Sequence, residues 1–283
     1  MVSQTSVLSL LAVLAVCCSS ASAYTDIDIL QFALNLEYLE GNFYSCATHG
    51  KPLDKGLWGV GGVKPVGCKK ALLSPDAYAY AAAVTKDEVN HVRFLRAAIK
   101  GAGYVPVSQP AINIGMAFST AANAALNTTL PFNYSPYASD VLFYLGAFIF
   151  EDVGSSAYLG AIPLISDKGV LGAAAAIMGV EGYHAASIRT LLHPYAGVAL
   201  YPFGAPVNAV INAISALRDA AAGTTMPRLE AGIIDASGND TLVPGNAASL
   251  LNARSVAQVL SIVYLGGKGM GGFYPMGMNG LFK

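Results

Sequence analysis

Two copies of one short motif carry residue types that can bind metal ions. Glu88 and His91 form a Glu-x-x-His motif, and Glu181 with His184 forms a second. In an α-helix of about 3.6 residues per turn, positions i and i+3 lie on one face, so each motif presents a carboxylate and an imidazole together. Each motif is therefore expected to supply both of its side chains to one metal ion.

Each motif follows a second pattern, a glutamate with a tyrosine seven residues later. Glu37 precedes Tyr44, and Glu151 precedes Tyr158. Seven residues correspond to about two helical turns, so the acid and the ring lie on the same face. The order Glu-x6-Tyr and then Glu-x-x-His occurs twice, with an offset of 114 residues for the first element and 93 for the second. This internal repeat keeps the spacing within helices but not the length of the connections.

Together these motifs form a plausible ligand set for two metal ions. Two helices that each supply a glutamate, and two that each supply Glu-x-x-His, make a dimetal site when they point into a four-helix bundle. An isolated buried carboxylate would protonate, whereas two divalent cations neutralise four carboxylates. Carboxylates and imidazoles without a sulfur ligand suit iron or manganese better than zinc or copper. The predicted ligands are Glu37, Glu88, His91, Glu151, Glu181 and His184.

Four further side chains near these ligands each have two interpretations. Glu40 is either an additional or supporting ligand or a solvated surface glutamate. Asp152 lies about 100° around the helix from Glu151. It is either a surface acid or an acid that supports the ligands. Tyr44 and Tyr158 are candidate catalytic residues that hydrogen-bond to the ligands, with ordinary core packing as the alternative.

The motifs resemble those of the ferritin-like di-iron carboxylate superfamily, and more narrowly the secreted desiccation-related protein family of plants and algae. The narrower resemblance rests on both Glu-x-x-His motifs, on residues 36–40 (LEYLE) with 43–44 (FY), and on 271–275 (GGFYP) with 279–280 (NG). It covers nearly all of the chain after residue 23. It implies an all-α fold, a ferritin-like four-helix bundle with a long crossover between the second and third helices and a helical, Gly-rich carboxyl-terminal extension.

Capping residues, prolines and apolar periodicity predict where the helices begin and end. The expected bundle helices run from near residue 26 to 46, from 75 to near 101, from 136 or 140 to about 163, and from about 167 to 193. A short helix is expected over 116–126 within the crossover, and two more over 207–222 and 255–265. The expected organisation is a signal peptide over 1–23, the bundle over 24–195, and an extension over 196–283 that packs on it.

The first 23 residues predict secretion. The apolar stretch 7–18 precedes a small-residue cleavage pattern, ASA, at 21–23, which is typical of a secretory signal peptide. An uncleaved anchor is the alternative, although this stretch is short for a membrane-spanning helix. The expected location is extracellular, in a cell wall or an apoplast-like space.

Cysteines and glycosylation sequons are compatible with that location. In an oxidising compartment Cys46 and Cys68 are expected to form a disulfide, with a free buried thiol as the alternative. Asn127, Asn133 and Asn239 each begin an Asn-x-Ser/Thr sequon, which predicts glycosylation.

The composition limits the kinds of partner. Apolar residues make up 54% of the chain and charged residues 12%, with a net charge of -1. Such a balance provides no field to attract nucleic acid or an anionic membrane. The uncharged segment 101–139 contains four prolines, which argue against a further membrane span after signal cleavage. The expected partners are a metal ion and a small-molecule oxidant, with a homo-oligomer or cell-wall association as further options.

Two functions follow from the resemblance. The first is a secreted protein with two iron or manganese ions that reacts with oxygen or peroxide, through iron oxidation or peroxide removal, and is linked to dehydration or oxidative stress. The second is a non-enzymatic extracellular protective or wall-associated protein that keeps the ligands for stability. Iron storage is not expected, because the long carboxyl-terminal extension would obstruct a ferritin cage. The sequence leaves the metal, the substrate and the oligomeric state open.

Overall fold

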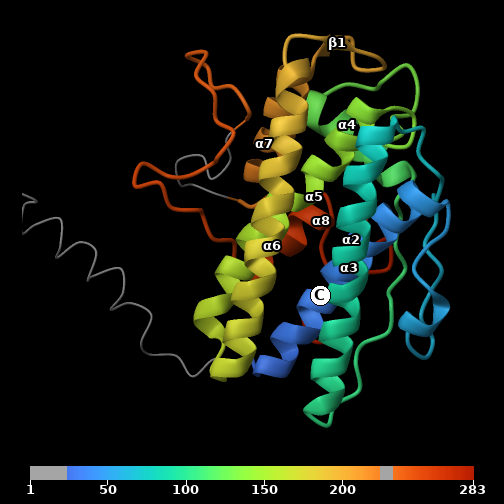
Figure 1. Cartoon of the computed structure of the whole chain (residues 1–283), viewed down its shortest axis with the longest axis vertical. Helices are drawn as coiled ribbons and strands as arrows, with labels where there is room; N and C mark the ends of the chain where they lie inside the picture. Colours follow the sequence, from blue (N-terminus) through green and yellow to red (C-terminus); the bar gives the residue numbers. More distant parts are fainter. Residues whose placement is uncertain (1–23, 224–231) are drawn as a thin grey trace, which may run out of the picture.

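A computed structural model of the chain describes residues 24–223 and 232–283. The predicted signal peptide, 1–23, lies outside the described residues. Four long helices dominate the fold: α2 (Asp26–His49), α3 (Pro75–Gly101), α5 (Asp140–Ala161) and α6 (Lys168–Leu192). They pack as two pairs, α2 with α3 and α5 with α6 (Figure 1). The predicted all-α bundle is confirmed.

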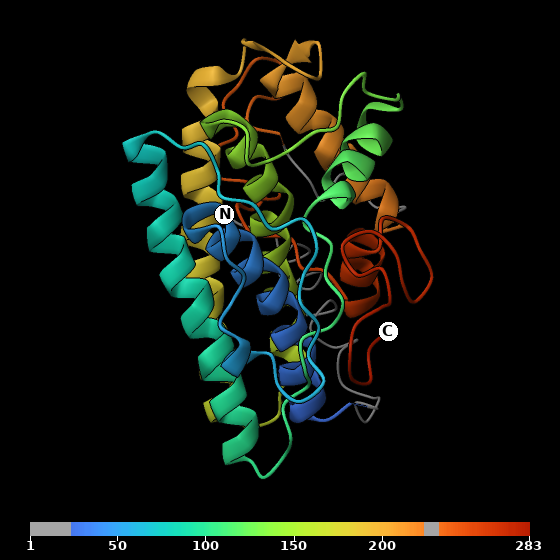
Figure 2. The same ribbon diagram turned by 90° about the vertical axis from the view of Figure 1, so that its right-hand side faces the viewer.

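Two capping acids show in which direction the four helices run. The Asp26 carboxylate accepts hydrogen bonds from the backbone N–H groups of Ser166, at 2.9 Å, and Asp167, at 2.7 Å, so α2 and α6 begin at the same end. Asp140 accepts a bond of 2.8 Å from the backbone N–H of Ser74, so α3 and α5 begin together at the other end. Because α3 and α5 run parallel, the chain between them returns along the bundle (Figure 2). The predicted long crossover is therefore present.

The limits of two bundle helices differ from the predicted ones for local reasons. α2 continues three residues beyond the predicted end, to His49, and closes at Gly50, whose φ of 67° lies in the left-handed region that favours glycine. α5 begins at Asp140 because the Ser139 side chain accepts a hydrogen bond from the backbone N–H of Leu142. The earlier of the two predicted starts, near residue 136, therefore lies in the crossover.

The remaining elements lie in the crossover, in short connections and after α6. They are η1 (Lys55–Leu57), α4 (Met116–Leu126), η2 (Ile162–Leu164), η3 (His193–Tyr195), β1 (Ala199–Leu200), β2 (Ala205–Pro206), α7 (Val207–Ala221) and α8 (Val256–Val263). The short antiparallel pair β1–β2 was not predicted. α7 ends one residue and α8 two residues before the predicted ends. α7 packs on α4, and α8 packs on α5 and α7.

The Gly-rich segment after α8 returns to the bundle. The Tyr274 hydroxyl donates a hydrogen bond of 2.8 Å to the backbone carbonyl of Asn35 in α2. The side chain of Asn35 donates to the carbonyl of Asn279 at 2.9 Å and accepts from its backbone N–H at 3.1 Å. Phe273 packs edge-on against the ring of Phe150 in α5. This segment therefore packs along the side of the bundle rather than forming a free arm (Figure 2).

The structure contains the predicted disulfide and exposes the predicted glycosylation sites. Cys46 and Cys68 are bonded, with an S–S distance of 1.99 Å, which ties the end of α2 to the following loop. Asn127, Asn133 and Asn239 are all exposed, so their glycosylation stays a prediction that surface access permits. Among the described residues, no helix is both long and apolar enough to span a membrane.

Candidate metal centre

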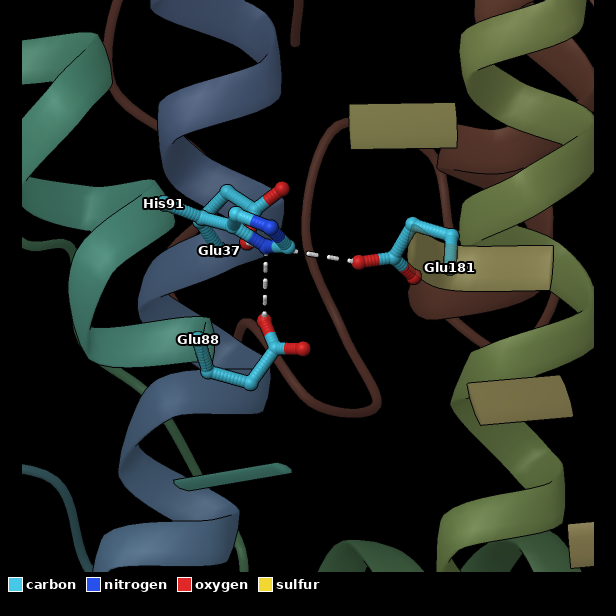
Figure 3. Close-up of side chains that lie close together, drawn as sticks. All are labelled: Glu37, Glu88, His91 and Glu181. Atoms are coloured by element: carbon cyan, nitrogen blue, oxygen red, sulfur yellow. Dashed lines mark ion pairs between the residues drawn. The ribbon is translucent and has the colours of Figure 1, made fainter. Parts of the chain in front are cut away.

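The six predicted ligands lie together in the middle of the bundle. α2 and α5 each contribute a glutamate, and α3 and α6 each contribute a Glu-x-x-His motif. All six side chains are buried, with exposed fractions between 0% and 8%. Figure 3 shows four of them converging from three helices. The six residues are Glu37, Glu88, His91, Glu151, Glu181 and His184.

The first group of candidate ligand atoms surrounds His91. Its Nδ1 atom lies 3.2 Å from Glu37 Oε2, 3.6 Å from Glu88 Oε2 and 3.6 Å from Glu181 Oε1. One atom from each of these four residues lies within 4.8 Å of the others, so a single ion between them could contact all four.

The second group surrounds His184 and shares a carboxylate with the first. Its Nδ1 atom lies 3.1 Å from Glu88 Oε1 and 3.3 Å from Glu151 Oε2. Glu88 thus directs one oxygen towards each histidine, as a bridging ligand would. The arrangement differs from the expectation that each motif serves its own metal ion, because Glu181 lies with His91 rather than with His184.

The two predicted tyrosines hydrogen-bond to the glutamates in a crossed arrangement. Tyr44 of α2 donates to Glu151 Oε1 of α5, and Tyr158 of α5 donates to Glu37 Oε1 of α2 at 2.5 Å. Burial raises the pKa of both hydroxyls well above the ordinary value, and the neighbouring carboxylates raise it further. Each tyrosine therefore remains a proton donor that orients the glutamate of the other repeat.

Several buried polar atoms of the centre have no hydrogen-bond partner in the described part of the chain, and metal ions could satisfy them. Burying a polar atom without a hydrogen bond costs about 1–3 kcal/mol, and more for a charged group. Divalent cations between the two groups would satisfy these atoms, and the carboxylate and imidazole donors suit iron or manganese. The atoms without a hydrogen-bond partner among the described residues include Glu37 Oε2, both oxygens of Glu88, Glu151 Oε2, both oxygens of Glu181, and Nδ1 of His91 and His184.

The pKa values of the centre reflect an excess of buried negative charge. Burial, with repulsion from Glu37, raises the pKa of Glu88 to about 7. Burial alone would lower the pKa of His91, but the negative charges of the neighbouring Glu37 and Glu88 carboxylates raise it to about 11. The pKa of His184 is likewise raised, by Glu151 and Glu88 against the effect of burial. Without cations, protons on the histidines compensate for part of the carboxylate charge.

Glu40 is not a surface residue, so that alternative was wrong. Its exposed fraction is 5%, and burial, followed by repulsion from Glu88, raises its pKa well above the ordinary value. Its counterpart in the repeat is Gly154, where a Cβ atom would lie 2.3 Å from Glu181 Oε2. Because Gly154 has no side chain, the Glu181 carboxylate can occupy this space. Glu40 belongs to neither group of ligand atoms, and its role as a ligand stays a prediction.

Asp152 is buried as well, so the surface alternative was wrong for it too. Its Oδ2 atom lies 2.7 Å from Arg189 Nη2 and 3.0 Å from Arg218 Nη2. Arg254 donates to the Asp152 backbone carbonyl at 3.4 Å. Asp152 therefore holds α5 to α6, α7 and the carboxyl-terminal segment, and belongs to neither group of candidate ligand atoms.

Asp87 and Tyr80 also contact the centre, and the sequence reasoning missed both. Asp87 Oδ2 lies 3.3 Å from His184 Nε2, and a carboxylate behind a metal-binding histidine orients the imidazole ring. The position equivalent to Asp87 in the second repeat is Val180, so this contact has no counterpart at the other motif. The Tyr80 hydroxyl donates a hydrogen bond of 3.4 Å to the backbone carbonyl of His184. The acid directly before the first Glu-x-x-His motif was the available signal for Asp87.

Comparisons with known proteins agree with this fold. The ferritin-like domain family matches residues 25–194, and the chain belongs to that family. The desiccation-related protein PCC13-62 of Craterostigma plantagineum is 32% identical over 198 residues, which are 69% of this chain and 62% of that protein. The chain thus spans less than two thirds of that relative.

A second relative is matched over more of its length. The ferritin-like catalase Nec2 of Nesocodon mauritianus is 29% identical over 267 residues, which are 90% of this chain and 84% of that protein. No solved structure matches the chain. The resemblance to ferritin-like and desiccation-related proteins that the motifs indicated is thereby confirmed.

Proposed function

We propose that the protein is a secreted dimetal carboxylate oxidoreductase that removes peroxide, with two iron or manganese ions, as part of protection against dehydration or oxidative stress. The observation that carries the proposal is the set of buried carboxylate and imidazole atoms in two adjoining groups that have no hydrogen-bond partner among the described residues. A bound pair of ions would supply the redox chemistry.

The side chains of the centre have distinct roles in this proposal. Glu88 would bridge the two positions, and Glu181 would add a ligand beside His91. Glu37 and Glu151 are held in place by the crossed tyrosine hydrogen bonds, so they cannot rotate away from the ions. Ligands held in a single orientation lower the reorganisation needed during the reaction.

In this proposal, a polar substrate reaches the centre from the side of His91 and His184. The side chains of His91 and His184 are 11% and 6% exposed, and that of Asp87 beside them is 43% exposed. The histidines therefore form the thin wall between the centre and solvent. Peroxide arriving there would stay in contact with polar groups.

The names of the two relatives support peroxide removal under stress. One is called a ferritin-like catalase and the other a desiccation-related protein. Dismutation converts two molecules of hydrogen peroxide into two of water and one of dioxygen. It balances without an external reductant, so the centre needs no separate electron donor.

Extracellular location is part of the proposal. The apolar segment 7–18 before a small-residue cleavage pattern, the Cys46–Cys68 disulfide and three exposed sequon asparagines support it. Mass analysis of the protein from its native host would show cleavage before Tyr24 and glycan mass at Asn127, Asn133 or Asn239. A protein that retains residues 1–23 and carries no glycan would contradict this part.

Elemental analysis of the protein purified from its native secretory host tests the metal centre. We expect about two iron or manganese ions per chain, dioxygen evolution from peroxide, and loss of both in a Glu88→Ala/Glu181→Ala variant. Asp76→Asn, an exposed acid on α3, serves as the control and should keep both. A native protein that is folded but free of metal would overturn the proposal.

A non-enzymatic protective protein is the second candidate. It is favoured by the raised pKa of His91 and His184, because protonated histidines can offset buried carboxylates without metal. In that case Glu88→Ala would change the free energy of unfolding, and the wild type would show no peroxide-dependent turnover.

A further inference from the structure

An apolar cavity lies in the bundle at the end where α2 and α6 begin. Its volume is about 20 Å³, and all four bundle helices line it. Every lining side chain is aliphatic or aromatic, and the hydroxyl of Tyr158 is the one polar group among them. Leu95 of the lining stands seven residues after Glu88 on α3, which places the cavity about 10 Å along the helix from the candidate metal centre.

The internal repeat explains why space is left here. Each lining residue that lies on one of the four bundle helices has a counterpart in the other half of the bundle, 114 or 93 residues away. Ala157 corresponds to Phe43, and Ala173 corresponds to Tyr80. In the other half these positions hold rings: the Phe43 centroid lies 5.0 Å from that of Tyr44, and the Tyr80 centroid lies 6.4 Å from that of Tyr144. Two alanines in place of two rings leave the cavity beside Tyr158.

The cavity lies between the surface and the side chain of Tyr158, which contacts the candidate metal centre. Phe94, which is 46% exposed, forms part of its outer wall. Tyr158 forms the inner wall, and its hydroxyl donates to Glu37 at 2.5 Å. A molecule in the cavity is therefore separated from a candidate ligand by a single side chain.

The chemistry of the walls selects an apolar molecule. A cavity lined by Leu, Ile and Phe stays dry and binds apolar guests, because water would lose its hydrogen bonds there. The volume of about 20 Å³ leaves room for one small apolar molecule. Hydrogen peroxide, which needs several hydrogen bonds, is disfavoured by these walls for the same reason as water.

We propose that this cavity is a dioxygen-binding site on the path between the surface and the metal centre, separate from the polar route at His91 and His184. The binding site stands on the cavity itself, whereas its place on the path rests on the proposed function. Dioxygen released by peroxide dismutation would leave through it without crossing the polar route.

Xenon, an apolar atom used as a probe, tests the site without requiring metal. In xenon-pressurised crystals of the full chain as purified, we expect xenon bound beside Ala157 and Ala173. Ala157→Phe introduces the ring found at the equivalent position of the other half and should abolish that binding. Ala173→Leu is the milder second variant, should the first fail to fold. Ala176→Leu, an exposed position on α6, is the matched control and should leave xenon in place.

Two xenon results would overturn the binding site: no xenon in the wild-type cavity, or xenon that persists in a folded filling variant. The path is tested by dioxygen release from peroxide by the metal-containing protein. We expect release to slow several-fold in the filling variant relative to Ala176→Leu, with the same metal content. Equal rates would overturn the path. A protein without metal would instead refute the proposed function, while the xenon measurement would still decide the binding site.

Discussion

The Oε1 atom of Glu88 lies 3.1 Å from Nδ1 of His184, although the two residues belong to different Glu-x-x-His motifs. The other oxygen of Glu88 lies 3.6 Å from Nδ1 of His91 in its own motif. One carboxylate on α3 thus joins both groups of candidate ligand atoms. The two halves of the repeat form one centre rather than two independent sites.

The absence of a side chain at Gly154 is expected to be required for metal binding. In Gly154→Ala the new Cβ would lie 2.3 Å from Glu181 Oε2, so the carboxylate must move away from the His91 group. Metal content per chain should fall. Gly179→Ala on α6, where a Cβ meets nothing within 4 Å, should keep its metal and gain about 0.5–1 kcal/mol of stability from alanine in a helix. Equal metal content in both variants would contradict the role given to Gly154.

The contact between Asp87 and His184 should make the two metal positions unequal. Replacing Asp87 with valine, the residue at the equivalent position 180, removes this contact. Loss of such an outer contact typically lowers metal affinity about 10–100-fold, and we expect that loss at the His184 position. Chelator competition followed by metal analysis measures it. If Asp87→Val loses each ion at the same chelator concentration as the wild type, the contact has no such role.

Asp152 should make the protein sensitive to acid. Burial alone would raise the pKa of Asp152, but the charges of Arg189 and Arg218 lower it below its ordinary value of 3.8. A carboxyl whose folded-state pKa is depressed contributes stability that is complete above the unfolded value and is lost as pH falls below it. The free energy of unfolding should therefore fall more steeply below about pH 4 in the wild type than in Asp152→Asn.

At neutral pH, Asp152→Asn should itself be destabilising. Removing one partner of a buried ion pair typically costs about 3–5 kcal/mol, because the remaining charge stays buried. Urea unfolding at several pH values measures both effects. Parallel pH profiles for the wild type and the variant would contradict the assignment.

The disulfide should stabilise the bundle at the end of α2. Cys46 and Cys68 are separated by 22 residues, and closing a loop of this length is worth about 3 kcal/mol in the chain-entropy model. Cys46→Ala/Cys68→Ala should lower the denaturant midpoint accordingly. Reductant should shift the midpoint of the wild type and leave the double variant unchanged; an equal shift in both would exclude the disulfide as its cause.

Local patterns in the sequence determined the helices and which residue types face the core. Helix starts at Ser74 and Asp167 follow from side chains that cap the first turn, and this depends only on neighbouring residues. The seven-residue spacing of Glu37 and Tyr44 likewise places both on one helix face. The ligand set and the long crossover were therefore predictable.

Only the tertiary structure decided which side chains meet. A helical period states the face on which a residue lies but not the residue opposite, because that depends on how distant helices pack. Asp152 could not be paired with Arg189 and Arg218, which follow it by 37 and 66 residues. The pairing of Glu88 with His184, and the space left beside Ala157, depend on the same packing of α3, α5 and α6.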